Sequence, residues 1–535
     1  MSATTATVDP LVERRSRYHE ADVVVVGAGV FGCAAAYALA NQGRSVILLE
    51  RWMKEPNRIV GELMQPGGVE ALRKLGLGDT IEGIDAAPCL GYNVVWKGKE
   101  SKIPYPPIEY LPDGSTRVAK QNKSKSKING SVAANGSANG HANGHANGSA
   151  AAVVAGHKTA DGVARPLGTS FHHGRFIMNL RRACLKHPNI TVFETEALDT
   201  IKGDHNPEVL GVETRTVNKE TGEKEQDYFF GQLTIAADGY ASRFRKRYIG
   251  VEPIVKSKFY ALELIDCDLP QPGYGHVIID ALAPVLLYQI GTHETRALIS
   301  VPERLPEAQP AAGGVRGYMT KHVLPALPAS VQPSFRAALE RDSRIPTSMP
   351  NSWLPPTRQE HAGLVVLGDA MNMRHPLTGG GMTVALSDVV LLAEVLDPTA
   401  VPDLTDFARV RRAMTDFHWR RKRLTAIINV LAQALYSLFA APGEDTDLGK
   451  LRRGCWEYFQ RGHTDEPVAM MGGLLPRPAT LAYHFFTVAF LAVWLDWCAT
   501  GFRPWLWPLL LWNAVSILYT ASVVFVPFMW TEAFH

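Results

Sequence analysis

A glycine-rich turn directly after a short apolar strand constrains this chain more than any other feature. Asp22 and the four valines after it indicate a buried parallel strand. Gly27-Ala28-Gly29-Val30-Phe31-Gly32 follows and opens a run of small residues suited to a closely packed helix. A second strand is expected at 45–49, after the turn at Gly43. This order of elements predicts a βαβ unit that binds a dinucleotide.

The residues at this turn restrict which dinucleotide can bind. Its glycines let the backbone approach a pyrophosphate placed at the helix N-terminus. Glu50 stands 18 residues past Gly32, at the end of the second strand, where its carboxylate can accept hydrogen bonds from an adenosine ribose and would repel a 2′-phosphate. The turn therefore predicts FAD or NAD rather than NADP. The alternative is a glycine turn with a purely structural role.

A second glycine-rich segment favours FAD over NAD. Gly368-Asp369-Ala370 follows a predicted strand at 363–367, and Pro376 and Gly379-Gly380-Gly381-Met382 lead into a helix expected over 382–395. The Asp369 carboxylate can bind a ribityl hydroxyl, while backbone N–H groups and the helix dipole can meet phosphate or the flavin edge. A third motif, Asp238-Gly239-Tyr240-Ala241-Ser242-Arg243-Phe244-Arg245, lies between these two segments.

Composition excludes several other classes of protein. The 535 residues are 46% apolar, which is enough for a large core in more than one domain. A net charge of only +3 gives no field that would attract nucleic acid. The six cysteines form no C-x-x-C pair and show no zinc-ligand spacing, so we expect a reducing compartment and no metal. The charged run Arg420-Arg421-Lys422-Arg423 is expected to be a solvated helix face.

The predicted fold class is α/β, with a Rossmann-type FAD-binding domain assembled from discontinuous segments. An α+β substrate-binding domain is expected where candidate strands at 276–280 and 285–290 mix with a Pro-rich helical stretch. Between about 120 and 162, repeats of Asn-Gly, Ala and His predict a disordered insertion; metal capture by His141 and His145 or glycosylation at Asn135 and Asn147 are its alternatives. The predicted units are a flexible N-terminus at 1–20, FAD-binding parts at 21–118, 164–252 and 359–400, the low-complexity insertion at 119–163, the substrate-binding domain at 253–358, C-terminal helices at 401–478 and hydrophobic membrane-anchoring helices at 479–535.

The last 55 residues differ in kind from the rest of the chain. Two apolar stretches, 481–497 and 505–530, hold six of the eleven tryptophans, and Arg503 is their one interrupting basic residue. The first stretch is short for a membrane span and carries Asp496, and the second contains Pro508 and Pro527. A helical hairpin that is embedded in, or barely crosses, one bilayer is therefore expected, with membrane lipid as a partner. Two core helices of a soluble domain are the alternative.

Three longer strings point to a known family. They are residues 58–68 (RIVGELMQPGG), 171–178 (FHHGRFIM) and 372–383 (NMRHPLTGGGMT). The three motifs described above, which begin at Gly27, Asp238 and Gly368, occur in the same order as in the hydroxybenzoate-hydroxylase-like FAD monooxygenases and resemble theirs. Within that superfamily, the chain resembles the squalene epoxidases from about Ala21 to its C-terminus, apart from the Asn-Gly insertion.

The resemblance assigns roles to residues that the sequence alone does not distinguish. From the residues alone, Arg58 and Arg175 fit ordinary surface ion pairs, and Tyr92 fits a core aromatic whose hydroxyl has a partner. The resemblance implies a functional role for Tyr92, holding neighbours such as Gln65 and the flavin edge in place. It implies FAD contacts from Val30, Phe31, Glu50, Arg51, Arg58, Arg175, Asp369 and Met382, and we expect Leu63, Gln65, Pro376 and Leu377 near the flavin end of an apolar substrate pocket.

The resemblance also implies a reaction. Reduced FAD would react with O2 to a C4a-hydroperoxyflavin, which converts squalene to (S)-2,3-epoxysqualene in sterol (ergosterol) biosynthesis. The resemblance implies that electrons come from a separate NADPH-dependent cytochrome P450 reductase, in keeping with the single G-x-G-x-x-G. Direct use of NADPH is the alternative, because superfamily members that use it also lack a second nucleotide fold. The expected location is the endoplasmic reticulum membrane, or also lipid droplets, with the catalytic domain facing the cytosol. The alternatives are an aromatic-ring hydroxylase or prenyl-chain reductase of the same fold, and a non-enzymatic prenyl- or lipid-binding module.

Overall fold

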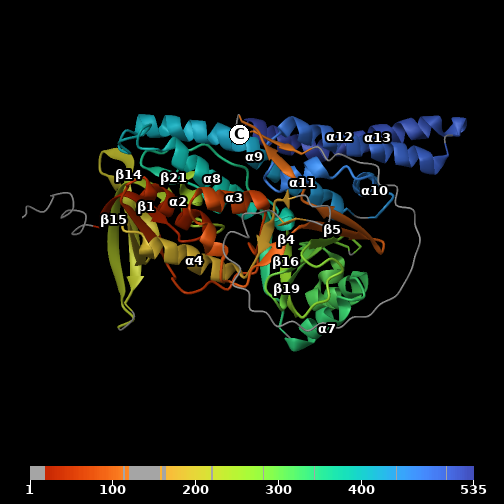
Figure 1. Cartoon of the computed structure of the whole chain (residues 1–535), viewed down its shortest axis with the longest axis horizontal. Helices are drawn as coiled ribbons and strands as arrows, with labels where there is room; N and C mark the ends of the chain where they lie inside the picture. Colours follow the sequence, from red (N-terminus) through yellow and green to blue (C-terminus); the bar gives the residue numbers. More distant parts are fainter. Residues whose placement is uncertain are drawn as a thin grey trace, which may run out of the picture.

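The structure is a computed structural model that describes residues 19–112, 115–119, 157–158, 164–218, 221–280, 282–342, 344–441, 443–501 and 503–534. The predicted flexible N-terminus at 1–20 and the predicted insertion at 119–163 lie almost entirely outside the described residues. The described part contains two large sheets and a layer of long C-terminal helices (Figure 1).

The first sheet is built from segments far apart in the sequence. Its order is β12-β2-β1-β15-β14-β13, and β21 also pairs with β15. β1 runs parallel to β2 and β15, and its valines at 23–25 are fully buried because helices cover the sheet. The strands predicted at the first glycine turn and at 363–367 are confirmed. The bounds are β1 Glu20–Val26, β2 Val46–Glu50, β12 Ile190–Glu194, β13 Glu196–Gly203, β14 Asn206–Val217, β15 Lys224–Ala236 and β21 Leu364–Val366.

Helices from three parts of the chain pack on this sheet. α2 (Val30–Asn41) contacts both α4 (His173–Lys186) and α8 (Gly381–Val395), and most of its buried residues are alanine, glycine or cysteine, whose small side chains allow a close approach. α3 (Pro66–Lys74) packs on α8, and the short α5 (Arg243–Tyr248) follows the third motif. The α/β class and the helix expected over 382–395 are confirmed.

The second sheet has the order β20-β16-β19-β18-β17-β5-β6. Strands β5 and β6 precede the Asn-Gly insertion in sequence, and β5 pairs parallel with β17. One face packs against α7 through Phe335 and Leu339, and the other contributes to the core beneath the C-terminal helices. The bounds are β5 Gly91–Trp96, β6 Lys99–Pro104, β16 Ile254–Ile265, β17 Gly275–Ile278, β18 Val285–Gln289, β19 Glu294–Pro302, β20 Ser348–Trp353, α6 Gly314–Tyr318 and α7 Gln332–Arg341.

Short strands connect the two large sheets. A three-stranded sheet of order β3-β11-β4 places residues 168–170 between residues 63–64 and residues 87–89. It places Leu63 and Gln65 between the first sheet and the second. The bounds are β3 Leu63–Met64, β4 Ala87–Cys89, β7 Ile108–Tyr110, β8 Thr116–Val118, β9 His157–Lys158, β10 Ala164–Arg165 and β11 Gly168–Ser170.

The C-terminal helices lie along one edge of the molecule (Figure 1). They are α9 (Phe407–Phe439), α10 (Asp447–Gln460), α11 (Asp465–Met471), α12 (Pro478–Thr500) and α13 (Trp507–Phe534). α12 and α13 form the predicted hairpin and are both long and apolar enough to cross a membrane. Only 17% and 22% of their most apolar stretches are buried, whereas the core helices of a soluble protein are mostly buried. This exposure favours the membrane interpretation.

Candidate active site

A cavity of about 220 Å³ lies where the first sheet, the second sheet and the glycine-rich segments meet. It brings together many of the predicted site residues although they come from distant parts of the chain. Those that line it are Gly29, Val30, Phe31, Arg58, Leu63, Tyr92, Asp369, Pro376, Leu377, Gly381 and Met382.

The first glycine turn is shaped by close backbone approach. Gly27 has a φ of 102°, and a Cβ there would stand 2.5 Å from the Ala237 carbonyl oxygen. A Cβ on Gly32 would stand 1.8 Å from the Gly27 carbonyl oxygen. Both glycines lie beneath the cavity wall and hold Gly29–Phe31 against the cavity.

Two helix N-termini open onto this cavity. α2 begins after Gly29 and α8 begins at Gly381, and neither N-terminus has a side-chain cap. Their first N–H groups are therefore available to a phosphate or to the electron-rich edge of a flavin. Asp369 and Arg58 flank the same space with 4.0 Å between their charged groups, and both are about two-fifths exposed. This combination of N–H donors and a partly exposed carboxylate fits FAD.

Glu50 is already engaged by the turn that it follows. Its Oε2 accepts a hydrogen bond from the Ala28 N–H at 2.8 Å and lies 3.3 Å from Arg181. The Arg181 guanidinium also donates to the Ala28 carbonyl oxygen at 3.0 Å. Glu50 therefore holds the turn in shape, and lone pairs that remain on its carboxylate are available for a ribose.

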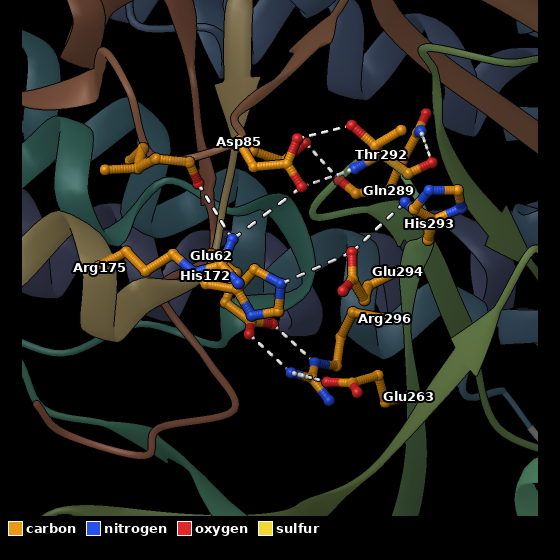
Figure 2. Close-up of polar contacts among 12 residues, drawn as sticks. Glu62, Asp85, His172, Arg175, Glu263, Gln289, Thr292, His293, Glu294 and Arg296 are labelled. Atoms are coloured by element: carbon orange, nitrogen blue, oxygen red, sulfur yellow. Dashed lines mark hydrogen bonds and ion pairs between the residues drawn. The ribbon is translucent and has the colours of Figure 1, made fainter.

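Some predicted cofactor residues lie away from the cavity wall. Gly380 forms the N-cap of α8, where a Cβ would stand 2.4 Å from Ile428. The Arg51 guanidinium stacks over the Trp52 ring at 4.6 Å. Arg175 lies 4.0 Å from Asp85 and donates to the Ile84 carbonyl oxygen at 3.4 Å (Figure 2). A contact between FAD and Arg51 or Arg175 stays a prediction.

Tyr92 joins three segments at the cavity wall. Its hydroxyl donates to the Thr378 carbonyl oxygen at 2.9 Å and accepts a hydrogen bond from the Gln65 side chain. Gln65 also donates to Thr378 at 2.7 Å and accepts from the Tyr105 hydroxyl at 2.5 Å. The contact expected between Tyr92 and Gln65 is present, and together they hold the Pro376–Thr378 turn.

Burial keeps this network neutral. Burial, with the nearby Cys89 thiol, raises the pKa of Tyr92 far above its usual value, and burial raises the pKa of Tyr105 as well. The Tyr92 hydroxyl therefore stays protonated at any physiological pH and acts as a hydrogen-bond donor. Its arrangement fits positioning of the turn rather than proton transfer.

His173 lines the cavity and was not predicted from the sequence. Its Nδ1–H donates to the Gly61 carbonyl oxygen at 2.8 Å, and burial with the charge of Arg58 lowers its pKa to about 4. The ring is therefore neutral at pH 7, and its Nε2 is an acceptor. The sequence signal was its place in the FHHGRFIM string, but nothing local separates it from His172.

Glu62 and Arg296 were also missed. They form a buried two-pronged ion pair with both N–O distances at 2.8 Å, and Arg296 lies 3.6 Å from Glu263 (Figure 2). Glu62 lines the cavity next to β3, whereas Arg296 belongs to β19 of the second sheet. The pair therefore ties the cofactor side of the cavity to the second sheet across 234 positions of sequence.

A second cavity of about 100 Å³ adjoins the first and is almost entirely apolar. The two share Tyr92, Val277, Leu377 and Thr378 as wall residues. The second extends between β5, α9, α10 and α11 to α12, which contributes Leu481, His484, Phe485 and Val488. A continuous apolar path thus runs from the turn at Leu377 to the first tail helix. Among the described residues, no group of three His, Cys, Asp or Glu side chains is placed to hold a metal ion.

Solved structures share this fold. The p-nitrophenol 4-monooxygenase PnpA of Pseudomonas putida superposes with a TM-score of 0.55 at 15% identity, covering 87% of this chain and 98% of that one. The flavin-dependent brominase Bmp2 gives a TM-score of 0.56, also at 15% identity, with coverages of 87% and 98%. At such identities the likeness concerns the fold.

Sequence relatives are much closer. The chain is 56% identical to squalene epoxidase ERG1 of Gibberella zeae over the full length of both chains. It is 36% identical to squalene monooxygenase of Mus musculus, covering 99% of this chain and 81% of that one. The family profile for FAD-dependent oxidoreductases matches residues 22–55, and the profile for squalene epoxidase matches residues 230–507. This chain therefore belongs to the squalene epoxidase family.

Proposed function

We propose that this chain is a monooxygenase that uses FAD and O2 to convert squalene to 2,3-epoxysqualene in sterol biosynthesis. The observation that carries the proposal is the join between the two cavities. The first cavity, which holds two helix N-termini and Asp369, shares Tyr92 and Leu377 as wall residues with the second, almost entirely apolar cavity. At these shared wall residues a flavin edge and a hydrocarbon end can meet.

The residues around the first cavity fit the parts of FAD. The α2 N-terminus suits the pyrophosphate, Asp369 a ribityl hydroxyl, and the α8 N-terminus the flavin ring. When bound, FAD supplies the activated oxygen. The protein's own task is to orient the alkene and to exclude water from the join, where Leu63 and Leu377 provide apolar walls. The neutral Tyr92 holds the turn that carries Leu377.

The second cavity supports binding of the unreactive part of the substrate. A squalene chain has no polar group, and this cavity offers almost none. Because α12 forms its far wall, an end of squalene can enter from lipid beside that helix and slide toward Leu377. Squalene is nearly insoluble in water, so such a route from the bilayer suits it better than one through solvent.

We further infer that the hairpin attaches the protein to the endoplasmic reticulum membrane or to lipid droplets with the catalytic body in the cytosol. Both the start of α12 and the end of α13 pack against the body, so the body lies on one side of the membrane (Figure 1). Exposed tryptophans at 505, 507 and 512 cluster around the turn of the hairpin, as expected for insertion into lipid. Membership of the squalene epoxidase family supports a separate NADPH-dependent cytochrome P450 reductase as the source of electrons, and the single G-x-G-x-x-G is in keeping with it.

Product analysis tests the reaction. Purified chain in detergent, supplied with FAD, squalene, a reductase with NADPH and ¹⁸O₂, is expected to form 2,3-epoxysqualene with one labelled oxygen. Omitting the reductase should stop turnover. Hydroxylated or hydrogenated products would favour another flavoprotein of this fold. A purified chain that stays colourless after incubation with FAD would favour a non-enzymatic lipid-binding module.

A further inference from the structure

A single charged residue near the end of the second tail helix is buried in the body of the protein. Glu532 is the one charged side chain in α13, and it is 2% exposed. A carboxylate in an apolar helix is costly to bury unless it is bound by partners, so its position calls for an explanation. The exposed residues of the same helix, such as Trp530 and Phe534, face away from the body.

Glu532 is the first member of a chain of buried hydrogen bonds. Its Oε1 accepts from the side-chain amide of Asn429 on α9 at 2.7 Å. The same amide nitrogen donates to the side-chain oxygen of Asn372 at 3.1 Å. Asn372 lies three residues after Asp369, inside the segment that leads to the α8 N-terminus. One amide thus connects the tail helix to the cofactor-side segment.

Asn372 is hydrogen-bonded to Arg374, a residue in the wall of the first cavity. Its backbone and side-chain oxygens both accept from the Arg374 guanidinium, at 2.7 Å and 2.9 Å. Arg374 lines that cavity and also donates to the Gly381 carbonyl oxygen at 3.4 Å. Gly381 is the first residue of α8, so the chain of contacts ends at the helix N-terminus that faces the flavin site.

Further buried charges fix the middle of this chain. Arg421 donates to the Asn372 side-chain oxygen at 3.2 Å and pairs with Asp388 of α8 at 2.6 Å. Arg421 and Lys422 are buried, so the expectation that this basic run is solvated is wrong for these two residues. In a buried network of this kind each member restricts the others, because a group that loses its partner cannot turn to water instead.

We propose that Glu532 is a positioning residue for FAD, acting through Asn429 on Asn372 and Arg374. Docking of α13 then makes the flavin-binding segment rigid in the form that binds the cofactor. The tail is in that case part of the cofactor site as well as a membrane attachment. The proposal rests on FAD as the cofactor, but it does not depend on squalene being the substrate.

Flavin affinity measured on the full-length protein in detergent tests this role. Glu532→Ala is expected to bind FAD about tenfold more weakly, which lies within the usual range for coupling between linked sites. Glu532→Gln should stay close to wild type, because its side-chain oxygen still accepts from Asn429. The matched control is Asp496→Asn, which removes a tail carboxylate that pairs with Lys450 at 3.0 Å and has no contact with Asn429, Asn372 or Arg374. It should leave FAD binding unchanged.

Several results would overturn the proposal. They are wild-type FAD affinity in Glu532→Ala, equal weakening in Asp496→Asn, or a Glu532→Gln variant as weak as Glu532→Ala. Circular dichroism and pelleting with membranes establish that each variant is folded and still attached.

Linkage supplies a second readout that needs no variant. If tail docking favours FAD, then FAD must favour tail docking by the same factor. Hydrogen exchange at the backbone amides of 528–534 should therefore slow on adding FAD to the wild-type protein, while amides of the exposed hairpin turn near Trp507 should not change. Equal exchange at 528–534 with and without FAD would refute the coupling. Neither measurement uses squalene, so a failure of the epoxidation assay would be distinguishable from a failure here.

Discussion

At the scale of single residues, the site depends on neutral side chains that hold a turn in place. Tyr92 and Gln65 both donate to the Thr378 carbonyl oxygen, which keeps Pro376 and Leu377 at the join between the two cavities. His375 supports the same turn from beneath, since its Nδ1 accepts from the Leu377 N–H at 3.2 Å. None of these groups has to change its protonation state for the turn to keep its shape.

Replacing Tyr92 separates positioning from acid catalysis. Tyr92→Phe loses the bond to Thr378, and we expect turnover to fall about fivefold, since a buried hydrogen bond contributes roughly 1 kcal/mol. Because the hydroxyl stays protonated, the pH profile between 6 and 9 should keep its shape. Steady-state rates across that range measure both quantities. Tyr105→Phe, which does not line either cavity, is the control and should lose less. Loss of an ionisation limb in Tyr92→Phe would contradict the positioning role.

His375 makes the folded state sensitive to acid. Burial lowers its pKa to about 3, so between pH 6.5 and 3 the unfolded chain binds a proton at this residue that the folded chain does not. Stability is complete above pH 6.5 and falls as pH decreases, by about 1.4 kcal/mol per pH unit for each such group. His375→Asn keeps an acceptor for the Leu377 N–H. It removes one titrating group, so the slope should fall by about 1.4 kcal/mol per pH unit. Unfolding free energies at pH 4.5, 5.5 and 7 test this, and an unchanged slope would contradict it.

At the scale of elements, the site depends on contacts between segments that are far apart in sequence. β5 and β6 belong to the second sheet, and the Glu62–Arg296 pair fixes the segment before β3 to β19. The pair is buried on both sides, so each charge depends on the other for compensation. Its effect is to set the distance between the cofactor side and the hydrocarbon side of the join.

Removing one member of that pair should be costly. Glu62→Gln leaves the Arg296 charge with only Glu263 at 3.6 Å, and we expect the free energy of unfolding to fall by about 3 kcal/mol. Glu263→Gln is the control, because Glu263 is partly exposed and its loss should cost less than about 1 kcal/mol. Denaturant unfolding measures both variants. Equal, small effects would show that the pair is not an important tie between the sheets.

Much of the element pattern was predictable because it has a local signal. The valines of β1, the small residues of α2 and the glycines before α8 indicate strand, helix and turn within a few residues. The sheet membership of β5 was not predictable, since its partner β17 lies more than 180 positions away and strand pairing leaves no local mark. Glu62, Arg421 and Glu532 look like solvated charges in the sequence, because burial depends on partners that only the fold brings together.

At the scale of the whole molecule, the tail has two faces with different tasks. Inward side chains such as Phe485 and Val488 form the wall of the apolar cavity. Outward side chains such as Trp505 and Trp512 are 74% and 71% exposed and are available to lipid. Attachment and cavity shape should therefore respond to different substitutions.

Substitutions at the exposed tryptophans separate the two tasks. Trp505→Ser with Trp512→Ser should weaken binding to lipid vesicles by at least about tenfold, because each indole contributes roughly 1.5–3 kcal/mol of apolar transfer. Turnover in detergent and bound FAD should not change. Val488→Ser, inside the cavity, should instead raise the KM for squalene and leave vesicle binding intact. Vesicle flotation and product assays distinguish them, and the opposite pattern would contradict this division.

The most direct test of the central claim is an experimental structure of the full chain with FAD and a non-reactive squalene analogue. We expect the flavin ring between Asp369 and the α8 N-terminus, with one end of the hydrocarbon at Leu377 and the rest along α9 toward Phe485 of α12. A flavin bound elsewhere, or a hydrocarbon that lies outside the cavity shared with α12, would contradict it.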